Sequence, residues 1–141
     1  DPRGNLNSTV IGSYHSPKIR MVGSGGAHDI ACLVNRLVIL MPHDPRRFKE
    51  KVDFITSPGL SDRRSGLKLP PGPVSLITER ARFSFESGTA ALSAIMPGYD
   101  EEDAVEGLSW EVKKTPDFKL IEKFGNKELV AARSCLKYLC N

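Results

Sequence analysis

The segment from Met21 to Ala31 constrains the fold of this chain more than any other, because three glycines meet the start of a helical pattern there. Apolar residues precede the glycines, and Ile30, Leu33 and Val34 follow at helical spacing. Glycine adopts positive φ at little cost, so the backbone can turn sharply between a strand and a helix. The amides of such a turn stay uncovered, and the helix adds free N–H groups and its positive dipole end. The segment therefore predicts a place for an anion or a developing oxyanion.

Two familiar phosphate-binding motifs do not fit this turn. Gly23 and Gly25 match the first two glycines of a dinucleotide fingerprint, but His28 stands at the third position. The lysine of a phosphate loop is absent from the segment. The structural alternative to ligand binding is a tight turn with close helix packing.

The residues around the turn read as strand, helix and strand. Residues 18–22 have strand composition, residues 27–35 have a helical pattern, and residues 37–41 are a continuous apolar run of strand length. Such a run is typical of a strand covered on both faces of its sheet. The succession predicts a βαβ unit with a parallel, right-handed crossover.

Further elements are expected along the rest of the chain. Strand patterns occur at residues 8–12, 52–56 and 74–77, with a short one at 110–112. Residues 81–86 and 89–96 predict an antiparallel hairpin around Ser87-Gly88. Asp100 is expected to cap a short acidic helix, and residues 126–139 read as a longer one. Residues 57–73 are the longest irregular segment.

Composition fits one globular domain and argues against several functional classes. The chain is 40% hydrophobic and 26% charged, and its net charge of +3 comes from scattered basic residues, so nucleic acid is not an expected partner. The longest apolar run is too short to cross a membrane, and no signal peptide is recognised. Three cysteines without CxxC spacing (Cys32, Cys135 and Cys140) favour a reducing, cytoplasmic location. The histidines lack zinc-ligand spacing, so no metal site is expected.

Four sequence blocks match one known family. They are Asp1–Gly12, Gly23–Ala31, Arg46–Gly59, and a fourth block made of Leu76–Phe85, Met96–Gly98 and Gly107–Val112. The third is the most specific, because Phe-Lys-Glu-Lys-Val-Asp-Phe-Ile-Thr-Ser-Pro-Gly is long and uninterrupted. Together the blocks resemble the beta-type subunit of family I coenzyme A transferases, of the glutaconate CoA-transferase group. The resemblance covers residues 1–112 and leaves 113–141 as a C-terminal helical tail.

The resemblance implies an α/β fold with an open, mostly parallel sheet, flanking helices and a C-terminal antiparallel hairpin. It also implies a reaction, the transfer of coenzyme A between an acyl-CoA and a carboxylic acid. A glutamate carboxylate attacks the thioester, and a glutamyl-CoA intermediate follows. Coenzyme A is then a substrate, and no further cofactor is expected. The implied partner is an alpha-type subunit within a hetero- or homo-oligomer, with neither nucleic acid nor a membrane.

In the family the nucleophilic glutamate lies upstream of the first block, in a Glu-x-Gly setting. The chain, which begins without methionine, therefore reads as the C-terminal part of a subunit, and we expect it to be inactive alone. Glu86 precedes Ser87-Gly88 but falls in the predicted hairpin, where a solvated glutamate is the better interpretation. Two alternatives stay open: a ring-cleaving CoA-thioester hydrolase subunit of the steroid-degradation type, and a non-catalytic module that binds CoA or a partner.

The resemblance assigns the site to the glycine turn and its surroundings. The backbone amides of Gly25 and Gly26 are the expected oxyanion donors. The expected substrate or CoA contacts are Gly23, Ser24, Ala27, His28, Arg46 and Arg47. The expected supporting residues are Asp29, which matches the helix dipole, and Thr56 and Ser57, which brace the turn before Pro58. For His28 the alternative is a merely packed or exposed side chain, and for the two arginines it is a solvated helical turn.

Overall fold

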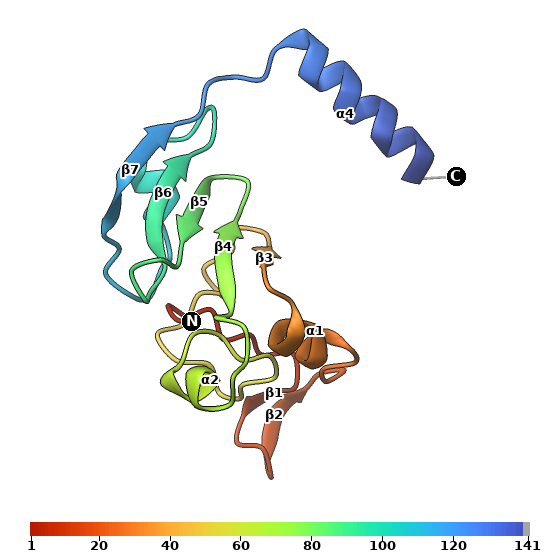
Figure 1. Ribbon diagram of the computed structural model, residues 1–141, viewed down its shortest axis with the longest axis vertical. Helices are drawn as coiled ribbons and strands as arrows, with labels where there is room; N and C mark the ends of the chain where they lie inside the picture. Colours follow the sequence, from red (N-terminus) through yellow and green to blue (C-terminus); the bar gives the residue numbers. More distant parts are fainter. Residues whose placement is uncertain (140–141) are drawn as a thin grey trace.

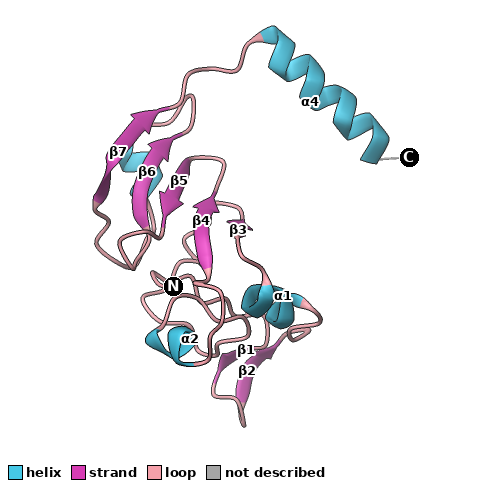
Figure 2. Cartoon of the chain, in the orientation of Figure 1, coloured by secondary structure: helices cyan, strands magenta, loops and turns pink. Residues whose placement is uncertain are grey.

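The computed structural model describes residues 1–139, in which two sheets and four helices form (Figures 1 and 2). The main sheet has the order β3 (Leu37–Leu40), β4 (Pro73–Ile77), β5 (Ala81–Ser84), β6 (Ala91–Ile95) and β7 (Lys114–Leu120). The second sheet pairs β1 (Val10–Gly12) with β2 (Pro17–Arg20). The helices are α1 (Ala27–Leu33), α2 (Asp62–Gly66), α3 (Glu101–Val105) and α4 (Asn126–Leu139). Figure 1 shows the small sheet below the main one, with α4 standing off at the opposite end.

The main sheet confirms the predicted α/β class. Strands β3 and β4 are parallel, as are β6 and β7, whereas β5 runs antiparallel to both of its neighbours. Four of the five strands described in this sheet therefore point the same way. The predicted hairpin is present as β5 and β6, and its turn is closed by the Gly88 amide, which donates to the Phe85 carbonyl at 3.0 Å.

The predicted βαβ unit is wrong in its pairing, although its strand, helix and strand all form. Strand β2 pairs antiparallel with β1, with Ile19 opposite Ile11 and Arg20 opposite Val10. Strand β3 instead pairs in parallel with β4. Because β1 takes up the backbone hydrogen-bonding groups of β2, helix α1 connects two separate sheets rather than two parallel neighbours.

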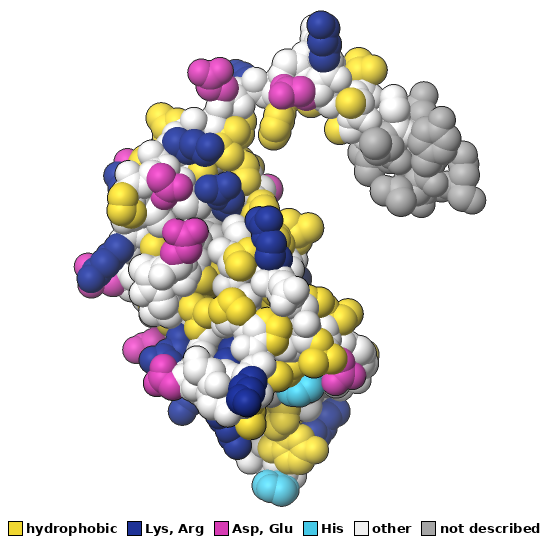
Figure 3. Space-filling view, in the orientation of Figure 1, with side chains coloured by type: hydrophobic (Ala, Val, Ile, Leu, Met, Phe, Trp, Pro, Cys, Tyr) yellow, Lys and Arg dark blue, Asp and Glu magenta, His cyan; other side chains and the backbone are white. Residues whose placement is uncertain are grey.

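Strand β3 is not covered on both faces, contrary to the expectation from its apolar run. It lies at the edge of the main sheet, and its side chains alternate between the two faces. Ile39 is buried, whereas Val38 is 45% and Leu40 73% exposed. On neighbouring α1, Ile30 and Leu33 are 55% and 68% exposed. Figure 3 shows hydrophobic side chains gathered on the surface around these elements.

The hydrophobic core lies under β4, β5 and β6, where apolar side chains from alternate positions meet. Phe83 and Leu92 are almost completely buried, and Phe85 and Ile95 join the same cluster. Helix α3 contributes the fully buried Ala104.

The expected cap of α3 is present as a capping box. The Asp100 side chain accepts a hydrogen bond from the Asp103 amide at 2.9 Å, and the Asp103 side chain accepts one from the Asp100 amide at 3.1 Å. Two of the backbone N–H groups that a helix start leaves free are therefore satisfied by side chains of the chain itself.

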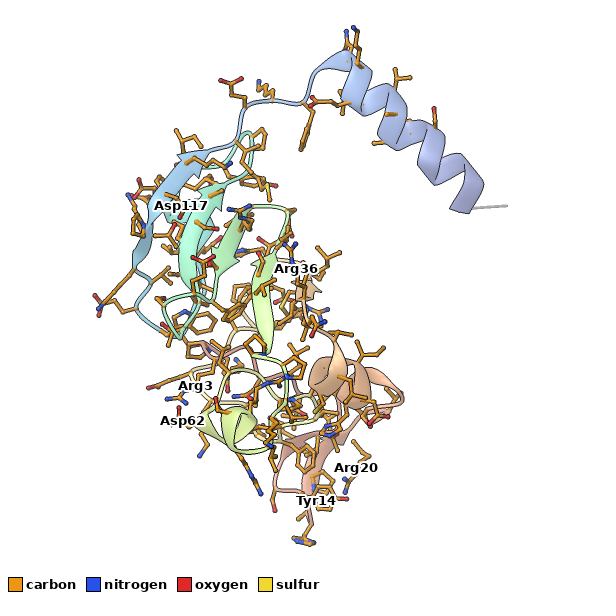
Figure 4. The ribbon with its side chains drawn as sticks, in the orientation of Figure 1. Arg3, Tyr14, Arg20, Arg36, Asp62 and Asp117 are labelled. Atoms are coloured by element: carbon orange, nitrogen blue, oxygen red, sulfur yellow. The ribbon has the colours of Figure 1, made fainter. Side chains whose placement is uncertain are left out.

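Two predicted strands do not form. Residues 52–56 are irregular, because Thr56 forms hydrogen bonds with Leu6 and Ser8 of the N-terminal loop rather than with a neighbouring strand. In the same segment, the Phe54 ring stacks on the Tyr14 ring of the β1–β2 hairpin, with the ring centroids 5.3 Å apart. Arg20, the last residue of β2, donates to the Tyr14 carbonyl at 2.8 Å, and Figure 4 shows both residues beside the small sheet. Residues 110–112 are also irregular.

Two elements differ from the sequence expectations. Helix α2 forms within the irregular segment 57–73. Strand β7 occupies part of the expected helical tail, where it pairs with β6 at Leu92 and Lys114. Most of its side chains are exposed, so buried and exposed positions do not alternate along it. Helix α4 matches the predicted helix 126–139.

The side chains of Cys135 and Cys140 lie outside the described part of the chain. Among the described residues, none of the helices has the length and apolar character needed to cross a membrane.

Candidate functional site

The glycine turn adopts the conformation that its composition predicts. Gly23 and Gly25 have φ of +88° and +48°, a region that residues with a Cβ rarely occupy. The turn is anchored at its start, because the Gly23 amide donates to the Ser8 carbonyl at 2.8 Å and the Ser8 hydroxyl donates to the Gly23 carbonyl at 2.7 Å. Glycine is therefore required at Gly23 and Gly25 by backbone geometry.

The far side of the turn is open. Gly25 and Gly26 are exposed, and a Cβ built on either would meet nothing within 4 Å. Within residues 1–139, neither amide donates a hydrogen bond to another part of the chain. Both amides thus belong to exposed residues and have no partner within that range, which an oxyanion donor requires. Their role in catalysis stays a prediction.

Helix α1 begins directly after the turn. Gly26 is its N-cap residue, and the Ile30 amide donates to the Gly26 carbonyl at 3.1 Å. The Ala27 amide donates to the Ser24 carbonyl at 2.9 Å, which closes the turn itself. Asp29 is exposed in the first turn of the helix, where a carboxylate interacts favourably with the helix dipole.

His28 connects α1 to the segment before Pro58. Its Nδ1 lies 2.9 Å from the Thr56 carbonyl oxygen, which can only accept, so Nδ1 carries the proton. The other ring nitrogen, Nε2, lies 3.7 Å from the Cys32 sulfur. The imidazole is therefore held in one orientation beside the glycine turn.

Thr56 and Ser57 hold the N-terminal loop in place. The Thr56 hydroxyl oxygen accepts from the Ser8 amide at 2.9 Å and lies 2.7 Å from the Thr9 hydroxyl. Ser57 and Leu6 exchange backbone hydrogen bonds at 2.9 and 3.1 Å. Both Thr56 and Ser57 are buried. Because Ser8 also anchors Gly23, Thr56 is linked to the glycine turn through a single residue.

Arg46 and Arg47 lie on a turn that follows Asp44. The Arg46 guanidinium donates to both Asp44 carboxylate oxygens, at 2.7 to 3.1 Å, and its side chain is 89% exposed. Arg47 lies farther from the same carboxylate, at 3.9 Å. The hydrogen bonds from Arg46 lower the pKa of Asp44 to about 2. The Asp44 carboxylate thus neutralises the charge of Arg46 at close range, whereas the longer distance to Arg47 leaves the charge of Arg47 less well neutralised.

We expect Arg46→Met to raise the pKa of Asp44 from about 2 back towards its ordinary value of 3.8. The pKa is lowered in the folded state, so the stability from this pair is complete above about pH 4 and is lost as the pH falls towards 2. NMR titration of the carboxyl carbon measures the change, with exposed Arg63→Met as the matched control. An unchanged midpoint in Arg46→Met would show that the pair does not exist in solution.

A cavity of about 460 Å³ lies between the main sheet and the loops that cover it. Arg46 and Arg47 line it, together with Lys49, Lys51 and Trp110, which the sequence analysis did not single out. None of the residues 23–28 lines it. The structure therefore separates the predicted site residues into two groups, the glycine turn with its supports and the basic turn at the cavity.

Arg64 is a further residue that sequence reasoning missed. It is only 3% exposed, and its guanidinium donates to backbone carbonyls, reaching Ala31 at 2.6 Å, Pro70 at 2.7 Å and Pro58 at 3.0 Å. In sequence it is one of two adjacent arginines in a loop rich in glycine and proline, a pattern typical of a solvated surface. Its contact with Ala31 ties α2 to the last turn of α1.

Comparison with known proteins gives consistent matches. The coenzyme A transferase family model matches residues 1–69. The beta subunit of glutaconate CoA-transferase from Acidaminococcus fermentans is 41% identical over 119 residues, covering 79% of this chain and 44% of the relative. The corresponding subunit of 3-oxoadipate CoA-transferase from Pseudomonas knackmussii is 35% identical over 140 residues, covering 95% and 54%. The crystal structure of glutaconate CoA-transferase from A. fermentans matches with a TM-score of 0.81 at 34% identity, covering 94% of this chain and 53% of that one.

The comparisons agree with the resemblance that the sequence blocks carry. Residues 1–69 match the coenzyme A transferase family, and most of the chain is similar to the B subunits of glutaconate and 3-oxoadipate CoA-transferases. The chain spans about half the length of the curated relatives it matches.

Proposed function

We propose that this chain supplies the oxyanion-binding part of a CoA-transferase beta-type subunit. The amides of Gly25 and Gly26 stabilise the negative charge that develops on the thioester oxygen when a carboxylate attacks it. The attacking carboxylate belongs to a glutamate outside these residues, so the 141-residue chain alone does not turn over. An acyl-CoA and a carboxylic acid are the substrates, and an alpha-type subunit is the partner in the cytoplasm.

One observation carries this proposal: two adjacent amides are uncovered at a turn that the chain holds rigidly. Ser8 anchors the turn at Gly23, and His28 anchors the start of α1 to Thr56. Donors held in place need no reorganisation when charge develops, which is the main advantage of an oxyanion site over water. The glycines leave room for a thioester to approach.

The names of the relatives support a transferase over the alternatives. Both curated relatives are subunits of CoA-transferases, one named for glutaconate and one for 3-oxoadipate. Both named acids carry two carboxylates. We therefore propose an acid of this class as the substrate, and a beta-type role next to a second polypeptide. Neither curated relative is named as a hydrolase or as a non-catalytic binding protein, so the names do not favour those two alternatives.

Reconstitution of the full-length subunit with its alpha-type partner tests the proposal. Acetyl-CoA and a dicarboxylic acid such as glutaconate are mixed, and mass spectrometry follows the CoA species. A new dicarboxyl-CoA thioester supports transfer. Release of free CoA without a new thioester would favour hydrolysis, and an unchanged mixture across a panel of acids would favour a non-catalytic module. Turnover by the 141-residue chain alone would contradict the assignment of the nucleophile.

A further inference from the structure

We propose that the cavity beside Arg47 is a binding site for the anionic end of an organic molecule with an apolar body. The anionic group is a carboxylate or a phosphate, both of which the proposed substrates contain, so the inference rests on the proposed function. The residues of the cavity are distinct from the glycine turn. Three independent features carry the inference: an apolar floor, an excess of cations, and a buried indole N–H that has no partner among the described residues.

The floor of the cavity is apolar and comes from the main sheet and its covering loop. Ile39 and Met41 extend along β3 and its end, Leu76 lies on β4, and Phe48 and Phe85 complete the surface. A volume of about 460 Å³ falls within the range of roughly 300–1,000 Å³ that small-molecule sites occupy. An apolar body of a few carbons therefore fits against this floor.

The cations that line the cavity exceed the anions available to neutralise them. Lys49 and Lys51 form no ion pair with any carboxylate among the described residues, and Arg47 approaches Asp44 only to 3.9 Å. The Asp53 carboxylate, which also lines the cavity, accepts a hydrogen bond from the Gly12 amide at 2.9 Å. An anion entering this space would meet several positive charges over an apolar surface, and its attraction is strengthened where water is excluded.

Trp110 gives the third argument. Its ring lines the cavity and packs edge-on against Phe48, with the ring centroids 6.0 Å apart. Its Nε1 is buried and has no hydrogen-bond partner in the described part of the chain. Indole nitrogen only donates, and a buried donor without an acceptor is costly. A carboxylate or phosphate oxygen in the cavity would supply that acceptor.

The experiment uses the full-length subunit with its partner and three probes. Glutarate represents the carboxylate, ADP represents the phosphate, and 1,5-pentanediol matches glutarate in chain length without charge. Calorimetry measures affinity. Trp110 is the single tryptophan of this chain, so the difference in fluorescence between the unchanged protein and Trp110→Phe reports occupancy of the cavity directly. We expect glutarate or ADP to bind and pentanediol not to bind, and the anion that binds identifies the source of the charge.

A matched pair of variants assigns the binding to the cavity. The double variant Lys49→Gln, Lys51→Gln should weaken anion binding at least tenfold. The double variant Lys18→Gln, Lys123→Gln removes the same charge from exposed positions away from the cavity and should leave affinity unchanged. Equal affinities in the two variants, equal binding of pentanediol, or no binding of either anion would overturn the inference.

The transfer assay on the unchanged complex separates this inference from the proposed function. Anion binding without any transfer would leave the cavity assignment standing and refute the function. Transfer with an unchanged KM in Lys49→Gln, Lys51→Gln would support the function and refute the cavity as a substrate site.

Discussion

Replacement of Gly26 by proline in the full-length subunit should lower kcat for CoA transfer by about 10²–10³-fold, the usual cost of one lost oxyanion donor. Proline removes the amide hydrogen at this position, and its ring also restricts the backbone of Gly25. Gly26 has φ of −82°, close to the range of about −65 ± 15° that proline adopts. A Cβ at Gly26 meets nothing within 4 Å. The loss should appear in kcat rather than KM, because the oxyanion forms only as the carboxylate attacks.

Gly26→Ala is the matched control, because alanine keeps the amide hydrogen and fits the same φ. Its Cβ enters open space, so the variant should retain most of the activity. A small loss of stability is expected in both variants, since glycine is a better N-cap residue than alanine. Circular dichroism melting curves compare the two proteins directly. Equal activity in the proline and alanine variants would rule out the Gly26 amide as an oxyanion donor.

The glycine turn was predictable from sequence because its information is local. Positive φ at Gly23 and Gly25, the start of α1 and the hairpin of β5 and β6 all follow from the conformational preferences of neighbouring residues. The cap of α3 at Asp100 is local in the same sense. Pairing partners are not local. Nothing in residues 17–20 shows that β2 prefers β1 to β3, so the predicted parallel crossover failed.

Exposed and irregular elements were missed for a related reason. Strand β7 lacks alternating apolar residues, because it is an edge strand with most side chains in solvent, and its place is set by pairing with β6. Residues 52–56 have strand composition, but Thr56 directs its hydrogen bonds to Leu6 and Ser8. Within the site, Arg46 and Arg47 were recognised by charge, whereas Trp110 is distant in sequence and joins the cavity only through the tertiary fold.

Arg64→Met should lower the free energy of unfolding by about 3 kcal/mol or more, the largest effect on stability that we expect. The buried guanidinium donates to carbonyls on three separate segments, at Ala31, Pro58 and Pro70. Methionine fills much of the volume but leaves these acceptors without donors, and each orphaned group costs about 1–3 kcal/mol. Urea unfolding followed by circular dichroism measures the difference.

Arg63→Met provides the control, because Arg63 is exposed on the same helix and should change stability by less than about 0.5 kcal/mol. Arg64→Lys should fall between the two, since one ammonium cannot reach all three carbonyls. The loss of Arg64 should also affect one helix before the rest of the chain. Ala31, whose carbonyl accepts from Arg64, lies in the last turn of α1, where a cation interacts favourably with the helix dipole. Backbone hydrogen exchange should therefore become faster in α1 first. Equal stability of the two methionine variants would mean that α1 and the glycine turn are held by other contacts, above all those of His28 and Ser8.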